Sequence, residues 1–187
     1  MSDPNAFGRV PAPGGMQEIN ALGRPLSKLP EPPVLTEHGP ARIIAMVNQK
    51  GGVGKTTSTI NLAAALAEFG RRVLVVDFDP QGAASAGFGV SPHDLDLTVY
   101  NILMDRHADI EEAILETSTP NVDLLPANID LSAAEVQLVN EVAREQVLAS
   151  QLRKVSDRYD VILIDCQPSL GLLTVNALAA AHGVVIP

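Results

Sequence analysis

A short run of glycine, lysine and threonine residues carries the residue types that bind phosphate. Glycines allow the backbone to curl so that successive N–H groups point at one anion, and a helix that begins there adds the positive end of its dipole. Lys55 can reach the terminal phosphates of a nucleotide, and the Thr56 hydroxyl can bind Mg²⁺. The run predicts a phosphate-binding loop made of Lys50, Gly51, Gly52, Val53, Gly54, Lys55, Thr56 and Thr57.

The residues on either side supply the elements that such a loop needs. Five apolar residues, Ile43–Val47, precede it as a strand, and residues 58–67 follow it with the pattern of a helix. Strand, glycine-rich loop and helix in this order are the context of a nucleotide-binding loop. We therefore prefer this interpretation to a glycine-rich turn that binds nothing.

Two other strand-like segments end in carboxylates. Residues 73–77 lead to Asp79, and residues 159–165 end at Asp165. Ligands of open α/β sheets bind at the carboxyl ends of the strands, so both aspartates are expected near the loop. The alternative for each is an aspartate that caps a turn. Asp77 is the weaker catalytic candidate because it still belongs to its strand.

The loop departs from the usual phosphate-loop pattern in one place. Gln49 stands where the first glycine is expected, and Lys50 adds a second lysine. With Asn48 before it, this deviant form resembles the ParA family of chromosome- and plasmid-partitioning ATPases, in the group that includes MinD and the nitrogenase iron protein. The resemblance covers residues 41–187 and implies a P-loop ATPase that uses ATP and Mg²⁺.

The resemblance also implies roles for single residues. Lys50, Lys55 and Asp79 are the expected catalytic residues. Lys50 is similar to the family lysine that reaches the partner's nucleotide across an ATP-dependent homodimer, and Asp79 to the aspartate that positions the attacking water. Thr56 and Asp165 match the magnesium-binding residues, with Asp165 acting through a water molecule.

Partners follow from the same resemblance. The ATP-bound dimer of the family binds DNA non-specifically, and a ParB-like centromere-binding protein stimulates hydrolysis. The formal net charge of this chain is −9, so its surface as a whole is not expected to bind DNA. The basic residues that bind DNA in the family are expected beyond this chain. No apolar run reaches membrane-spanning length, so we expect a cytoplasmic protein, associated with the nucleoid if it behaves as the family does.

The predicted fold class is α/β, a mostly parallel sheet with helices on both faces, of the P-loop NTPase type. A capping box of Ser132 and Glu135 is expected to begin the helix predicted over residues 133–152. Because the family's domain continues past Pro187, the sheet is expected to be incomplete. The expected strands are 42–48, 73–77, 122–126, 159–165 and one from 184, and the expected helices are 56–69, 97–104, 110–116, 133–152 with a break near Gln146, and 172–181.

Two parts of the chain differ in composition. Residues 1–40 hold eight of the fourteen prolines and are predicted to be a disordered Pro/Gly-rich tail, or alternatively an arm that docks a partner. Residues 41–187 are the predicted N-terminal portion of a ParA-like ATPase domain. A MinD-like ATPase that cycles on membranes and a truncated, non-catalytic binding fragment stay open as alternatives, and so does the choice between chromosome and plasmid.

Overall fold

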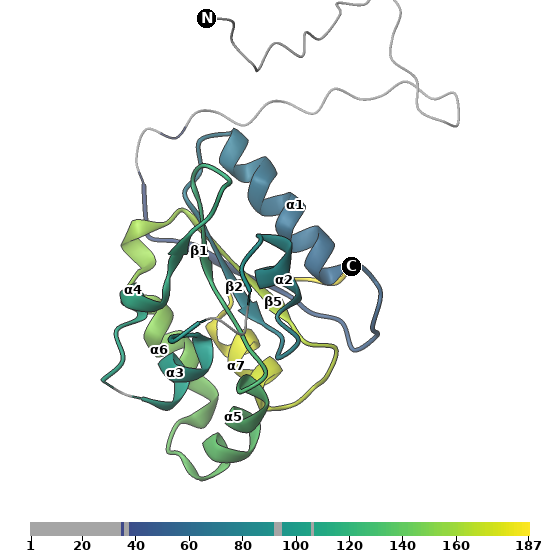
Figure 1. Cartoon of the computed structure of the whole chain (residues 1–187), viewed down its shortest axis with the longest axis vertical. Coiled ribbons are helices and arrows are strands. Elements are labelled where there is room, and N and C mark those ends of the chain that lie inside the picture. Colours follow the sequence, from purple (N-terminus) through teal and green to yellow (C-terminus); the bar gives the residue numbers. More distant parts are fainter. Residues whose placement is uncertain (1–34, 36–37, 92–94, 106) are drawn as a thin grey trace, which may run out of the picture. The chain divides into compact units, whose positions relative to one another are not determined.

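The computed structural model describes residue 35 and residues 38–91, 95–105 and 107–187 (Figure 1). The predicted tail, residues 1–40, lies almost entirely outside these residues. The described part contains a six-stranded sheet in the order β3-β4-β2-β5-β1-β6. The predicted α/β class with a mostly parallel sheet is confirmed, because every neighbouring pair except β3–β4 runs parallel.

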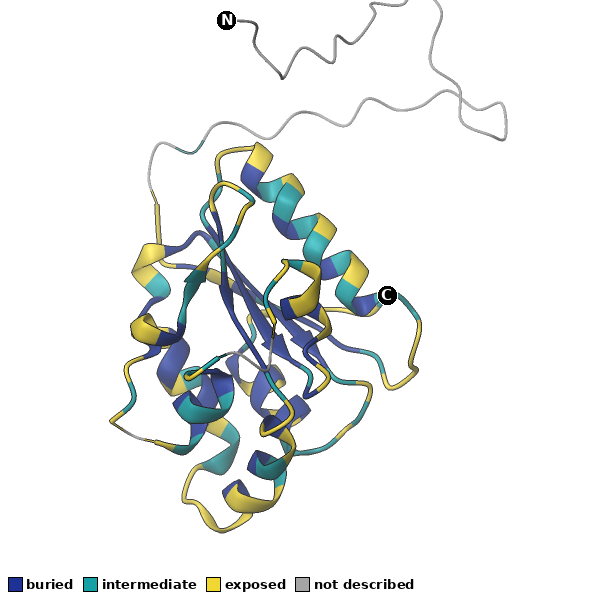
Figure 2. Cartoon of the chain, in the orientation of Figure 1, coloured by how far each residue is buried: buried dark blue, intermediate teal, exposed yellow. Residues whose placement is uncertain are grey.

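The strands in the middle of the sheet are apolar on both faces, as parallel strands between two helical layers must be. Val73 and Val75 of β2 pack in one cluster, while Leu74 and Val76 pack in the other, because successive side chains of a strand point to opposite faces. Figure 2 shows the resulting buried band through the centre of the domain. The strands are β1 Arg42–Met46, β2 Val73–Phe78, β3 Leu115–Glu116, β4 Val122–Leu125, β5 Val161–Cys166 and β6 Gly183–Val185.

Helices cover both faces of the sheet (Figure 1). Helix α1 packs its small residues Ala63 and Ala67 on one face, and α3, α5, α6 and α7 build the larger core on the other. Alanines bring a helix close to a sheet, which keeps the loop before α1 near the strand ends. The helices are α1 Lys55–Glu68, α2 Ala83–Gly87, α3 Val99–Met104, α4 Ile110–Ala113, α5 Leu131–Gln137, α6 Val147–Arg153 and α7 Leu172–Ala180.

Two helix predictions are wrong in part. The helix expected over 110–116 ends at Ala113, and β3 then pairs antiparallel with β4. The long helix expected over 133–152 is split between α5 and α6 by 3₁₀ turns, and Ala143 has a left-handed φ of 59°, which no α-helix continues through. The break thus begins after Gln137 and extends to the predicted position near Gln146, since α6 begins at Val147.

The predicted capping box is also wrong. Helix α5 begins at Leu131 after Asp130, so Ser132 lies inside the helix and caps nothing. Glu135 instead turns its carboxylate toward the segment that precedes α7.

Strand β6 lies at the edge of the sheet, paired with β1. Its side chains are exposed, with Val184 at 46% and Ile186, directly after the strand, at 74%. The expectation of a partly uncovered sheet fits this edge within the described residues. In the part of the chain that the structure describes, no helix is long and apolar enough to cross a membrane.

Candidate functional site

The phosphate-loop candidate connects β1 to α1. Gly52 and Gly54 have φ angles of 71° and 90°, a left-handed conformation that side chains with a Cβ rarely adopt. No neighbour lies within 4 Å of a Cβ built at either position, so backbone conformation and not crowding requires glycine there. Gly54 is the N-cap of α1 and offers no side chain to cap it. The first N–H groups of α1 are therefore left for a ligand.

Lys55 is the first residue of α1 and is buried, with 7% of its surface exposed. Its ammonium donates a 3.5 Å hydrogen bond to the carbonyl of Lys50, back across the loop. A buried ammonium is costly unless a negative group compensates it. This position suits a lysine that meets an anion in the loop.

A cavity of about 300 Å³ lies at the loop. It unites the loop with Asp79, which follows β2, and with Pro168, which follows β5. Three segments separated in sequence thus meet at the carboxyl ends of parallel strands, where ligands of open α/β sheets bind. The lining residues are Gly51, Gly52, Gly54, Lys55, Thr56, Thr57, Asp79 and Pro168.

Asp165 is fully buried on β5 beside the start of α1. The Thr59 hydroxyl donates to its Oδ1 at 3.4 Å. Burial raises the pKa of Asp165, against the opposing effect of Thr56. Within the described residues its Oδ2 has no hydrogen-bond partner. A buried carboxylate oxygen without a partner is costly, and it fits a group that binds Mg²⁺ or its water.

The two aspartates at the end of β2, Asp77 within the strand and Asp79 just after it, occupy different environments. Asp77 is fully buried and accepts hydrogen bonds of 2.7 Å from both the N–H and the hydroxyl of Ser85. Burial raises the pKa of Asp77 to about 6. Asp79 is half-buried, lines the cavity, and accepts a 2.9 Å hydrogen bond from the N–H of Gln81. Asp77 therefore ties α2 to β2, and Asp79 remains the candidate that faces a ligand.

Lys50 and Val53 do not line the cavity. Lys50 is exposed, and its backbone N–H donates to Oδ1 of Asn48 at 3.0 Å. The described chain alone thus leaves the catalytic role of Lys50 as a prediction. Thr59 was not predicted as a site residue from the sequence, although it lies one helical turn after Lys55 and faces Asp165 across the contact between α1 and β5.

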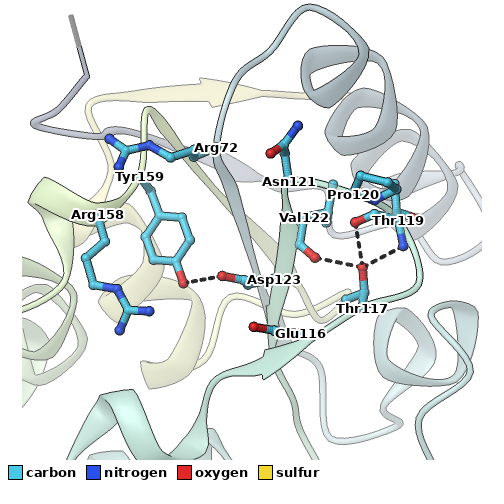
Figure 3. Close-up of a pocket in the computed structure, with 10 residues that line it drawn as sticks. All are labelled: Arg72, Glu116, Thr117, Thr119, Pro120, Asn121, Val122, Asp123, Arg158 and Tyr159. Atoms are coloured by element: carbon cyan, nitrogen blue, oxygen red, sulfur yellow. Dashed lines mark hydrogen bonds between the residues drawn. The ribbon is translucent and has the colours of Figure 1, made fainter.

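A larger cavity, of about 460 Å³, lies at the amino ends of β2, β4 and β5 (Figure 3). Figure 3 shows Tyr159 pointing to Asp123, and its hydroxyl donates to the Asp123 carboxylate at 2.8 Å. Thr117 donates to the carbonyl of Val122 at 2.7 Å. Several polar groups of this cavity thus bind one another, while Nε of Arg72, which also lines the cavity, is buried without a hydrogen-bond partner among the described residues.

Comparison with known proteins identifies the family to which the chain belongs. A family model described as an AAA domain matches residues 41–187. An uncharacterized protein of Mycobacterium tuberculosis is 57% identical over 98% of this chain and 60% of its own length. The sporulation initiation inhibitor protein Soj of Bacillus subtilis is 53% identical over 78% of this chain and 57% of that protein. The chromosome partitioning protein ParA of Myxococcus xanthus is 51% identical over 78% of this chain and 51% of that protein.

Solved structures show the same relation. A Mycobacterium smegmatis protein described as cobyrinic acid a,c-diamide synthase, with bound ATP analog and magnesium, is 46% identical, with a TM-score of 0.76 over 79% of this chain and 59% of its own. A plasmid partition protein of Borrelia burgdorferi is 31% identical, with a TM-score of 0.71 over 80% of this chain and 65% of its own. The chain thus spans little more than half the length of the curated relatives it matches.

Proposed function

The chain belongs to the AAA domain family, among the ParA and Soj partition ATPases, and from this membership we propose that it binds MgATP and hydrolyses it to ADP and phosphate. One observation carries the proposal: a single cavity is lined by the loop glycines, Lys55, Thr56 and Asp79. The Mycobacterium smegmatis relative, crystallised with an ATP analog and magnesium, supports the choice of ligand.

Binding rests on the loop and the start of α1. The backbone N–H groups after Gly52 and Gly54 surround the phosphates, and Lys55 neutralises part of their charge. Thr56 and Asp165 would hold Mg²⁺, with Asp165 acting through a water molecule. Bound Mg²⁺ neutralises charge on the phosphate oxygens.

Hydrolysis requires a water molecule held in line with the terminal phosphate. Asp79 is the group we assign to this task, because its carboxylate lines the same cavity as Lys55 and Thr56. Asp77 is occupied by Ser85 and is assigned no part in the reaction.

We assign Lys50 to a second copy of the chain. Two ammonium groups about 4 Å apart repel by about 4 kcal/mol at an effective dielectric of 20. Two loops that face each other across a two-fold axis resist contact until triphosphates lie between them. Nucleotide then gates a homodimer, Lys50 stabilises charge on the partner's phosphate, and hydrolysis releases the pair.

The biological role we propose is partition of a chromosome or plasmid. It includes a ParB-like partner that stimulates hydrolysis and non-specific DNA binding by the ATP dimer. These are properties of a whole protein, and this chain covers 51–60% of the relatives compared above.

The test compares Lys50→Ala with the unchanged chain. Calorimetry measures MgATP binding, sedimentation measures dimerisation, and phosphate release measures turnover. We expect Lys50→Ala to bind MgATP normally, to stay monomeric, and to lose most of its turnover. Lys154→Ala, an exposed lysine after α6, is the matched control and should change none of the three.

Any other outcome would remove part or all of the proposal. A Lys50→Ala variant that dimerises and turns over normally removes the cross-dimer role. An unchanged chain that binds MgATP without turnover makes this chain a nucleotide-binding module, and one that does not bind MgATP at all rejects the proposal.

A further inference from the structure

A carboxylate from α5 lies at the start of α7. Oε1 of Glu135 accepts a 3.0 Å hydrogen bond from the Gln167 side chain and a 3.5 Å hydrogen bond from the backbone N–H of Leu173. Gly171, the N-cap of α7, has no side chain to cap the helix itself. Glu135 therefore performs this task from another helix, and its negative charge lies at the positive end of the α7 dipole.

The N-cap position of α7 is built around this carboxylate. Gly171 has φ −76° and ψ −175°, a conformation open to any residue, so its backbone does not require glycine. A Cβ at this position would overlap the Glu135 carboxylate. The absence of a side chain at 171 thus makes room for Glu135, and the two residues form one unit.

The residues that Glu135 holds connect the metal-binding strand to the cavity wall. Asp165 is near the end of β5, Gln167 follows two residues later, and Pro168 lines the loop cavity. We define residues 167–171 as the connecting segment. Within it the Ser169 carbonyl accepts a 2.9 Å hydrogen bond from Thr174, so α7 holds its far end.

We propose that Glu135 is a positioning residue for ATP hydrolysis, which fixes the connecting segment so that Pro168 closes the cavity beside Asp79. The inference rests on the proposed ATPase function. Glu135 touches neither loop nor cavity, and acts through Gln167 and α7. It has no part in gripping the phosphates, so its loss acts on the chemical step more than on binding.

The first test separates kcat from KM. We expect Glu135→Ala to lower kcat about tenfold, the effect of one hydrogen bond to a charged group, while the Kd and KM for MgATP change less than about twofold. Glu135→Gln keeps an oxygen acceptor at the same reach and should recover part of the lost kcat. Glu68→Ala, at the exposed end of α1, is the control.

The second test uses Gly171 as a partner in a double-mutant cycle. Gly171→Ala should lower kcat and the unfolding temperature because the new methyl group displaces the Glu135 carboxylate. In the Glu135→Ala background the space is vacant, so the same change should cost much less, and the two effects should not add.

Three results overturn the proposal: an unchanged kcat in Glu135→Ala, a loss confined to KM, or fully additive effects in the cycle. Amide exchange of residues 167–173 and thermal unfolding need no turnover. If the unchanged chain does not hydrolyse ATP, the ATPase proposal fails by itself. Faster exchange in Glu135→Ala and a non-additive unfolding cycle then still establish the Glu135–Gly171 unit, while unchanged exchange with additive unfolding rejects it.

Discussion

Both ends of the sheet carry buried charged residues, but the two ends differ in how far neighbouring groups compensate these charges. At the carboxyl end, Asp165 is fully buried, and its Oδ2 lacks a hydrogen-bond partner among the described residues. The buried ammonium of Lys55 has a long 3.5 Å contact with a carbonyl. At the amino end, most charged groups bind one another, although Nε of Arg72 is buried without a hydrogen-bond partner among the described residues. Buried charges without full compensation are costly to fold, and their concentration beside the glycine-rich loop indicates a ligand there.

Asp160 shows how a carboxylate at the amino end is compensated by its neighbours. Its carboxylate accepts hydrogen bonds from the N–H of Arg72 at 2.7 Å and from the His38 ring at 2.9 Å, and the Arg72 guanidinium lies 3.7 Å away. Burial raises the pKa of Asp160, but the Arg72 N–H, His38 and Gly39 outweigh it, and the net pKa is lowered. The amino end is thus organised to stabilise the domain.

Cavity size alone would place the ligand site at the amino end of the sheet. The amino-end cavity of about 460 Å³ is larger than the loop cavity of about 300 Å³. The difference that identifies the site is chemical, since left-handed glycines, a helix start without a side-chain cap and an unpaired carboxylate oxygen occur together at the loop.

The largest difference in MgATP binding is expected between variants of two cationic residues, one at each end of the sheet. Lys55→Ala should weaken MgATP binding at least about 100-fold, because it removes several charge-assisted hydrogen bonds at once. Arg158→Ala, in the wall of the larger cavity, should leave binding unchanged. Calorimetry with MgATP measures both, and a loss of binding in Arg158→Ala would move the site to the amino end.

The next largest effect is expected at Asp79, at the carboxyl end of the sheet, where a change should affect hydrolysis but not binding. Asp79→Ala should bind MgATP with a Kd within about twofold of the unchanged chain but hydrolyse it about 100-fold more slowly, a typical effect of losing the group that handles the attacking water. Single-turnover phosphate release after mixing with excess protein isolates this step. Turnover at the original rate would reassign the role to another residue.

The sequence could predict the loop and the strands because their signals are local. Glycine spacing, apolar runs and strand-end aspartates correctly predicted that the loop and Asp79 meet in one cavity. Asp165 was correctly expected beside Thr56 for the same reason. Thr59 was missed because its partner is 106 residues away, and a helical pattern does not show which strand a side chain faces.

Glu135 shows the limit of the local signals most clearly. Its spacing from Ser132 predicted a capping box, but the helix begins two residues earlier, at Leu131, and the carboxylate caps α7 instead of α5. The helix expected beyond Ala113 failed for a similar reason, because pairing with β4 outweighed the local helical pattern. Both errors arise where tertiary contacts override local preference.

At the amino end the expected effect is on stability. Asp160→Asn should lower the free energy of unfolding by about 1–3 kcal/mol at pH 7, because hydrogen bonds to a charged acceptor become weaker. Since the pKa of Asp160 is lowered by folding, this contribution is present above its ordinary value of about 4 and is lost as the pH falls through the folded-state value. Denaturant unfolding at pH 7 and at acid pH should show the two proteins converging, with MgATP binding unaffected at pH 7. A deficit that persists at acid pH would mean that packing, and not charge, is what Asp160 supplies.

The smallest effect is expected at Tyr159. Tyr159→Phe removes the hydroxyl that donates to Asp123 at 2.8 Å and keeps the ring that packs in the core, so the free energy of unfolding should fall by about 1 kcal/mol. Asp123→Ala removes the acceptor from the other partner, and because both variants break the same hydrogen bond, the double variant should cost less than the sum of the two single changes. Denaturant unfolding measures all three, and the Kd for MgATP should stay constant in each. A changed Kd would mean that the amino end communicates with the loop through β5, the strand that begins just after Tyr159 and contains Asp165, and the division of the sheet into a stabilising end and a reactive end would then be wrong.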